Sequence, residues 1–523
     1  MLQVKQKSWV KPGEHLSAIA TLKRLWPTLF AERVSRLTGG NVRRFVVSTH
    51  ALALSTTLEK LADPAHPLTT DQRAALQVLA TSAADFDTVT LPKALMRNLY
   101  KHGQLSQAEQ DTLRKLPAML EDDQDDSPEN AHRQRTIAQL LCDNRPETYY
   151  ALILMDGDRM GGWLAGNECD YKLAYRDTWH SKVLSEMDMY ERRDPQLKTY
   201  LTTKRPVSPG RHGAISQALN DFSTRLARHV VEECCKGKLL YAGGDDVLAL
   251  VAVDDLFDCM QLLRLAYSGI APSEAMGLGE RIGTLAKGGS GTQRKLLLDK
   301  GFGLLNGRLM TLMGHKATAS MGAVVAHHSA PLGMVLRELR AAESRAKNTV
   351  HGKDSKGDDI NRDAFCLRVL KRGGGEVNVT SPWWKVERDE NDHPLPPDTS
   401  QSALALMREL ATKLAETDFS RGAIYRAELW FAGLTDEAKD AKSAAWRDQM
   451  TSSLAHQFKR QQGDEELARR VVNFVCDVMK PPHPKTAIDN FLVTSEFFAR
   501  EARAFRPDKA AGRNMPESNG VAA

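Results

Sequence analysis

The stretch LLYAGGDDVLALV (239–251) places two adjacent carboxylates, Asp245 and Asp246, between two apolar runs. Gly243 and Gly244 precede them, so the pattern predicts a strand, a tight turn and a second strand. Adjacent carboxylates repel each other, and burial makes it costly to keep both charged. Two explanations are open for these four residues. Gly and Asp are common turn formers, and clustered carboxylates also bind divalent cations.

A second acidic motif, MDGDRMGG (155–162), follows the apolar run YYALILM (149–155). Asp156 stands at the end of this predicted strand. Asp158 is a further candidate ligand, or alternatively the cap of a following helix. Because a single DGD motif is weak evidence for a site, its meaning depends on which elements lie beside it.

The elements that carry these motifs follow a recognisable order. We predict strands at 149–155, 238–242, 247–253 and 317–328, helices at 215–235, 255–268 and 331–348, and a last strand at 365–372. The order β-α-β-β-α-β is that of the ferredoxin-like fold, which belongs to the α+β class. In such a sheet the first strand lies beside the central hairpin. We therefore expect Asp156 to face Asp245 and Asp246 at the hairpin tip.

This arrangement predicts a particular chemistry. Three convergent carboxylates beside an open cleft suit Mg²⁺ or Mn²⁺, with substrate phosphates completing the coordination. Two such ions can activate an attacking hydroxyl and stabilise a leaving phosphate. Gly243 and Gly244 allow the backbone to approach a phosphate closely. The residues thus indicate phosphoryl or nucleotidyl transfer.

The 523-residue chain is long enough for several domains. We predict a mainly helical linker domain at 1–147, a catalytic α+β domain at 148–375, a helical C-terminal domain at 376–505 and a disordered tail at 506–523. Two insertions, 168–210 and 269–316, interrupt the catalytic domain, and the second holds the Gly-rich loop KGGSGTQRK (287–295).

The composition restricts the partners and the cellular compartment that we expect for the protein. The net charge of +5 permits a nucleic-acid partner without requiring one. Seven scattered cysteines without a CxxC pair predict reduced thiols and a cytoplasmic location. No apolar run reaches the length of a membrane helix, and the first residues have no signal-peptide core, so we expect no membrane partner.

Five motifs in this order resemble the large subunit of type III CRISPR effector complexes, the Cmr (type III-B) kind in particular. They are YYALILMDGDRMGG, HGAISQALNDFS (212–223), LLYAGGDDVLAL, ATASMGAVVAHHSAPL and AAESRAKN. The resemblance covers about residues 148–372, and KPGEHLSAIATLKRLWP (11–27) is similar to a segment just upstream in that family. It implies a palm domain like that of nucleotide cyclases and polymerases, flanked by helical domains.

The family resemblance also implies an activity and partners. Members make cyclic oligoadenylate second messengers from ATP when the guide crRNA of the complex pairs with target RNA, and they assemble with other protein subunits. By that resemblance, one ATP's 3′-hydroxyl attacks the α-phosphate of another and pyrophosphate leaves.

Individual residues take roles from the same resemblance. Asp156, Asp245 and Asp246 become the metal ligands, and the last two also form the catalytic pair. Gly243 and Gly244 line the nucleotide. The resemblance places Ser216 near the adenosine and Lys347 at the triphosphate; a helix-bonded hydroxyl and a surface cation are the alternative roles of these two.

The sequence departs from the family pattern in three respects. None of the 15 histidines is followed by Asp, so the His-Asp nuclease motif is missing and we expect no DNase activity in this chain. A first, non-catalytic palm half is not expected in it either. Relatives carry a zinc-binding cysteine cluster where this chain has SWVKPGEHLSAIA (8–20), so bound zinc is doubtful.

Two other functions compete with this interpretation. A diguanylate cyclase carries GGDEF or GGEEF, whereas Val247 follows Asp246 here and no sensor domain precedes the motif. A non-catalytic scaffold would have no reason to keep mutually repelling carboxylates. Trp383 and Trp384 are predicted to be packing residues rather than platforms for stacked bases.

Overall fold

A computed structural model describes residues 15–40, 46–83, 86–101, 105–121, 127–142, 145–166, 174–279, 281–285, 295–353, 357, 359–385, 397–415, 420–461 and 463–502. The chain divides into two compact units, 1–48 and 49–523. Helix α1 (Ala18–Thr38) belongs to the first unit, and Ser17 caps its N-terminus by accepting a hydrogen bond from the Ala20 amide. All other elements below belong to the second unit.

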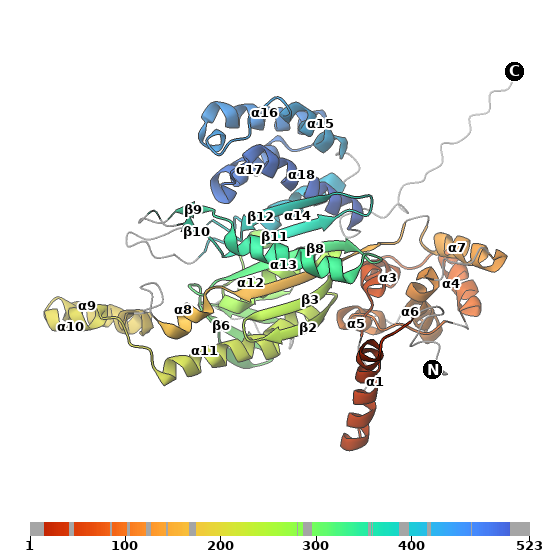
Figure 1. Ribbon diagram of the computed structural model, residues 1–523, viewed down its shortest axis with the longest axis horizontal. Helices are drawn as coiled ribbons and strands as arrows, with labels where there is room; N and C mark the ends of the chain where they lie inside the picture. The colour runs from red at the N-terminus through yellow and green to blue at the C-terminus, as the bar shows by residue number, and fades with distance from the viewer. Residues whose placement is uncertain are drawn as a thin grey trace. The chain divides into compact units, whose positions relative to one another are not determined.

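Within the described residues, six strands of the second unit form one sheet in the order β12-β11-β8-β1-β3-β2 (Figure 1). Their bounds are β1 (Tyr149–Gly157), β2 (Gly237–Gly243), β3 (Asp246–Ala252), β8 (Ala319–His327), β11 (Ala364–Leu370) and β12 (Glu376–Pro382). Strand β1 pairs antiparallel with both β3 and β8. The central order β8-β1-β3-β2 is that of a ferredoxin-like sheet, so the predicted α+β fold class is confirmed.

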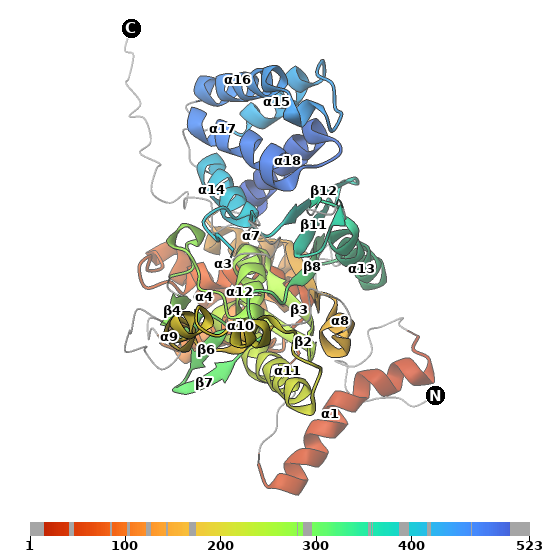
Figure 2. The same ribbon diagram turned by 90° about the vertical axis from the view of Figure 1, so that its left-hand side faces the viewer.

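Helices cover both faces of this sheet. Ala151, Ile153 and Met155 of β1 belong to one buried cluster with helix α12 (Leu256–Ser268). Helix α13 (Leu332–Asn348) lies across β8 and β11 (Figures 1 and 2), and its buried residues are outside that cluster. Because side chains alternate along a strand, consecutive residues at the end of β1 point to different helices.

The helix between β1 and β2 is irregular. It begins as α11 (Pro209–Asp221), with Ser208 as its N-cap, and continues through two π-helical turns at Phe222–Leu226 and His229–Cys234. The predicted range 215–235 is therefore its C-terminal part. The short helix α8 (Met160–Ala165) directly follows β1.

Both insertions contain regular structure. The first carries α9 (Ser181–Glu191) and α10 (Pro195–Thr202). The second forms a separate sheet of β4 (Ile282–Thr284), β5 (Leu296–Asp299), β6 (Phe302–Leu305) and β7 (Arg308–Thr311), none of which is among the predicted strands. Most of the Gly-rich segment 287–295 lies outside the described residues. A further small pair, β9 (Gly352–Lys353) and β10 (Asp359–Ile360), precedes β11.

The structure tests two predictions for the end of the sheet, and it contradicts one and confirms the other. The prediction that 365–372 is the last strand is wrong, because β12 follows it and pairs with β11 beyond residue 375. Trp383 and Trp384 are both almost fully buried, which confirms them as packing residues. The predicted tail 506–523 lies outside the described residues, and the predicted domain boundaries stay predictions.

Helices precede and follow the sheet. On the N-terminal side they are α2 (Thr49–Ala53), α3 (Ser55–Leu61), α4 (Thr70–Ser82), α5 (Lys93–Lys101), α6 (Gln107–Glu121) and α7 (Pro128–Leu140). On the C-terminal side they are α14 (Ala403–Ala415), α15 (Gly422–Phe431), α16 (Ala444–Arg460), α17 (Glu465–Phe474) and α18 (Pro484–Glu501), which Figure 2 shows as one bundle. Across the described residues, no helix combines the length and the apolar character that a bilayer crossing requires.

Candidate active site at the hairpin tip

The pairing of β1 with β3 brings the two acidic motifs together. Met155 is the register partner of Val247, so Asp156 lies level with the GGDD turn. Gly244 adopts a positive φ of 76°, a conformation that favours glycine, and no neighbouring atom lies near the position of a Cβ there. At Gly243 an added Cβ would overlap the ring of Tyr241. The turn therefore needs both glycines for local reasons as well.

Burial, a hydrogen bond to Asp156 and the neighbouring charges of Asp156 and Asp245 raise the pKa of Asp246 to about 7. Burial also raises the pKa of Asp245. The crowding of these carboxylates therefore disfavours the charged form of Asp246 at neutral pH.

Lys347 supplies a cation to this group. Helix α13 can approach β8 closely because Gly322 has no Cβ. A Cβ added there would lie 2.8 Å from the Leu339 carbonyl oxygen, which is too close. Near the end of that helix, Lys347 Nζ lies 2.6 Å from Asp156 Oδ2 and also pairs with Glu343. Burial disfavours the charged amine, but the bonds to both carboxylates outweigh it and raise the lysine's pKa.

Gly157 and Tyr267 belong to the site, although sequence reasoning missed both. Gly157 points to the α12 face, where an added Cβ would lie 2.5 Å from Tyr267 Oη and 2.7 Å from Asp245 Cβ. Tyr267 is fully buried, its ring packs edge-on against Phe222, and its hydroxyl has no hydrogen-bond partner among the residues that the structure describes. Burial raises the pKa of this phenol, so it stays neutral. A glycine directly after the strand-end Asp was the available signal.

Asp158 is buried inside the fold and does not cap a helix. Its side chain is 3% exposed and accepts hydrogen bonds from Thr318, Ser320 and the backbone amide of Asp363. Arg159, not Asp158, is the N-cap of α8, and no side chain caps that helix. The carboxylate is therefore already occupied inside the fold.

The structure brings six of the seven predicted site residues together, and Ser216 is the exception. Asp156, Asp245, Asp246 and Lys347 lie in one cluster beside Gly243 and Gly244. Ser216 is exposed on α11 and takes no part in the contacts of that cluster. Its predicted place near the adenosine stays a prediction.

The donor set fits a hard divalent cation. Four carboxylates, those of Asp156, Asp245, Asp246 and Glu343, lie around Lys347. A divalent ion bound here would relieve the repulsion between these carboxylates. In the part of the chain that the structure describes, no group of three or more His, Cys, Asp and Glu is arranged to hold a metal. Mg²⁺ sites, however, commonly use one or two carboxylates with substrate phosphates.

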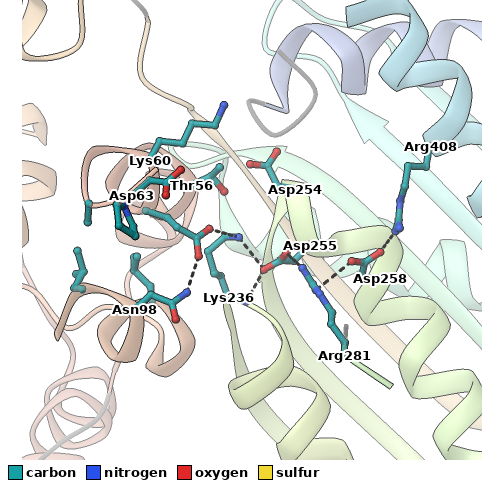
Figure 3. Close-up of a pocket in the computed structure, with 15 residues that line it drawn as sticks. Thr56, Lys60, Asp63, Asn98, Lys236, Asp254, Asp255, Asp258, Arg281 and Arg408 are labelled. Carbon is teal, nitrogen blue, oxygen red and sulfur yellow. Dashed lines mark hydrogen bonds and ion pairs between the residues drawn. The ribbon is translucent and has the colours of Figure 1, made fainter. Parts of the chain in front are cut away.

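A second polar feature lies at the opposite end of the same hairpin. It is a pocket of about 540 Å³ between α3, α5 and the residues that flank β2 and β3 (Figure 3). Lys236 Nζ lies 2.9 Å from Glu59 Oε2 and 3.1 Å from Asp255 Oδ2, and Arg281 lies 2.9 Å from Asp255 Oδ1. Burial raises the pKa of Asp255, but Lys236 and Arg281 outweigh it and keep that pKa low. This network ties the N-terminal helices to the root of the hairpin.

Replacing Lys236 with Met is expected to destabilise the protein by about 3 kcal/mol, because Glu59 and Asp255 would lose a buried counter-charge. Thermal unfolding of the full chain measures the effect. The control is Lys439→Met, which breaks an exposed pair with Glu437 and should leave the unfolding temperature unchanged. Equal unfolding temperatures for the two variants would contradict a structural role of this network.

Parts of this chain are similar in sequence to known proteins. Residues 149–281 match the family model "Cas10/Cmr2, second palm domain". The CRISPR system Cmr subunit Cmr2 of Pyrococcus furiosus is 31% identical over 246 residues, which cover 46% of this chain and 21% of that protein. The CMR subunit Cmr2 of Saccharolobus solfataricus is 27% identical over 164 residues, covering 30% of this chain and 13% of the relative.

Solved structures show the same fold. A chain of the type III-B Cmr-beta complex in the apo state matches with a TM-score of 0.59 and 16% identity, over 96% of this chain and 52% of its own length. The complex bound to cognate target RNA gives a TM-score of 0.60 and 16% identity, over 94% and 53%. The chain thus spans about half the length of these solved chains and matches a smaller part of the curated relatives. The resemblance that the five motifs carry is confirmed.

Proposed function

We propose that this chain, whose palm is that of a Cas10/Cmr2-type subunit, is the nucleotidyltransferase of an RNA-guided effector complex of the Cmr kind. In this proposal it converts ATP to cyclic oligoadenylates when target RNA is bound. The observation that carries it is the crowded pair of Asp156 and Asp246 at the tip of a palm hairpin, beside Lys347. Such a cluster suits a cation and nucleotide phosphates.

The partners of the proposed complex are guide crRNA, target RNA and other Cmr-type protein subunits. The support is the similarity to Cmr-beta chains, one of which was solved with cognate target RNA. We place the complex in the cytoplasm. The six cysteines among the described residues are free thiols, as expected in a reducing compartment.

In the proposed reaction the side chains of this chain hold the cation and position the nucleotide. Asp156, Asp245 and Asp246 would hold Mg²⁺ or Mn²⁺, which when bound lowers the pKa of the attacking 3′-hydroxyl and neutralises the leaving pyrophosphate. Lys347, whose Nζ lies 2.6 Å from Asp156 Oδ2, would turn toward the triphosphate in this reaction. The open Gly244 position allows a phosphate to approach the backbone. Buried Tyr267 closes the apolar side of the cluster.

The test is nucleotide analysis after the assembled complex has been incubated with ATP, Mg²⁺ and matching target RNA. We expect rings of adenylate that appear only with matching RNA and disappear when EDTA removes the cation. A cyclic dinucleotide of guanine formed from GTP would instead support a diguanylate-type cyclase. No product under any activating RNA would reject both enzymes and favour a non-catalytic scaffold.

A further inference from the structure

The charged side chain of Asp158 lies in the protein interior, two residues after Asp156. Ser320 Oγ donates to Asp158 Oδ1 at 2.7 Å, and Thr318 Oγ1 donates to Oδ2 at 2.8 Å. The Asp158 amide donates to the Thr318 carbonyl at 2.9 Å. Ser320 is also the register partner of Asp156 across β1 and β8. The Asp158 carboxylate therefore fastens the end of β1 to β8 directly opposite Asp156.

A loop in a rare backbone conformation completes the environment of Asp158. Arg362 and Asp363 have positive φ angles of 71° and 46°, which non-glycine residues seldom adopt. This conformation directs the Asp363 amide to Asp158 Oδ2 at 2.9 Å. Arg362 also approaches Asp158 Oδ1 at 3.7 Å. Two consecutive residues of this kind persist only where the surrounding contacts enforce them.

The same loop is held from the α12 face by Arg264, which is 1% exposed. Its guanidinium lies 2.7 Å from Asp363 Oδ1, and it also bonds Ser268, which in turn donates to the Ala317 carbonyl at 2.6 Å. The guanidinium stacks over the Trp384 ring at 5.0 Å. A continuous buried polar network thus links α12, the loop before β11, β8 and the end of β1.

From this network we infer that Asp158 is a positioning residue that sets where Asp156 lies relative to the GGDD turn. This inference rests on the proposed function. Asp158 touches none of the reacting groups. A buried carboxylate and a strained loop both destabilise the protein, and the two occur together at this point. The side chain of Asp156 is 30% exposed, and the ion pair it makes among the described residues is with the long side chain of Lys347. Fixing the backbone on its C-terminal side therefore fixes the side chain that would hold the cation.

The test compares Asp158→Asn with Glu147→Gln. Asparagine keeps the shape of the side chain but turns an N–H group toward donors. Glu147 is a matched control, because it is also a buried carboxylate, lies at the other end of β1 and accepts a hydrogen bond from the Thr57 amide at 3.0 Å. Both variants should unfold at similarly lowered temperatures. Ser320→Ala is a milder variant that keeps the charge and removes one hydrogen bond to Asp158.

Two measurements separate positioning from stability. In the assembled complex, Asp158→Asn should lower kcat for ATP about tenfold with little change in KM, and Ser320→Ala about fivefold. In the full chain with a non-hydrolysable ATP analogue, electron paramagnetic resonance should show about tenfold weaker Mn²⁺ binding for Asp158→Asn. Glu147→Gln should leave kcat and Mn²⁺ affinity at the wild-type values.

The outcomes distinguish the inference from the proposed function. If Asp158→Asn and Ser320→Ala match Glu147→Gln in both kcat and Mn²⁺ affinity, the positioning role is wrong while the activity stands. If the wild-type complex forms no product but Asp158→Asn still weakens Mn²⁺ binding, the proposed activity is wrong and the positioning role stands. Should Asp158→Asn not fold, Ser320→Ala decides by the same two measurements.

Discussion

Replacing both Asp245 and Asp246 with Asn should reduce oligoadenylate synthesis by about 10³-fold while the complex still assembles. Asparagine has nearly the same shape as aspartate, so the GGDD turn can keep its backbone. The change removes the negative charge that would hold the cation and thus several kcal/mol of transition-state stabilisation. It also relieves the repulsion that raises the pKa of Asp246, so the folded chain should not lose stability. Product formation by the assembled complex and its thermal unfolding are the two measurements.

The matched control for this variant is Asp188→Asn combined with Asp448→Asn, which removes the same amount of charge from two exposed positions. It should retain wild-type product formation. More than a tenth of the wild-type rate in the Asp245/Asp246 variant would contradict a catalytic role for these carboxylates. Loss of assembly without any change in unfolding temperature would point instead to a scaffold that uses the turn as a contact.

Gly157→Ala should lower product formation by about 100-fold, although it adds only one methyl group. The new Cβ would stand 2.5 Å from Tyr267 Oη and 2.7 Å from Asp245 Cβ, closer than such atoms can approach. Tyr267 is fully buried and cannot easily move away, so the GGDD turn should be displaced from Asp156. A shift of about 1 Å in a catalytic group costs on the order of 10²-fold in rate.

Gly161→Ala is the control for this prediction, since Gly161 lies in α8 with no atom within 4 Å of an added Cβ. It should keep the wild-type rate. The double variant Gly157→Ala with Tyr267→Phe removes one of the two close contacts and should recover part of the lost rate. If Gly157→Ala alone retains full activity, the spacing between Asp156 and Asp245 is not critical for the reaction.

The sequence was enough to predict that Asp156 lies beside the GGDD turn, because the order of the strands carries that information. The apolar runs before Asp156 and around Asp245 predicted β1, β2 and β3, and the β-α-β-β order places β1 beside β3. The same reasoning misjudged regions of weak periodicity. It ended the sheet before β12, and it did not predict the four-stranded sheet of the second insertion.

Asp158 shows where a motif stops being informative. In MDGDRMGG it is as acidic as Asp156 and only two residues further along the chain. In the structure Asp156 is partly exposed beside Lys347, whereas Asp158 is buried under Thr318, Ser320 and Asp363. Nothing within the motif distinguishes the two residues, because their difference comes from segments far along the chain.

The sequence by itself determined the α+β palm, the family resemblance and the position of the acidic hairpin tip, since these depend on local periodicity and on the order of elements. The tertiary structure decided which side chains meet there. Alternation along β1 directs Asp156 toward Lys347 on α13 and Gly157 toward Tyr267 on α12. Which helix covers which face, and how closely, depends on packing between distant segments, such as α13 against Gly322. That packing surrounds the carboxylates of the GGDD turn with Lys347, the buried phenol of Tyr267 and the end of β1.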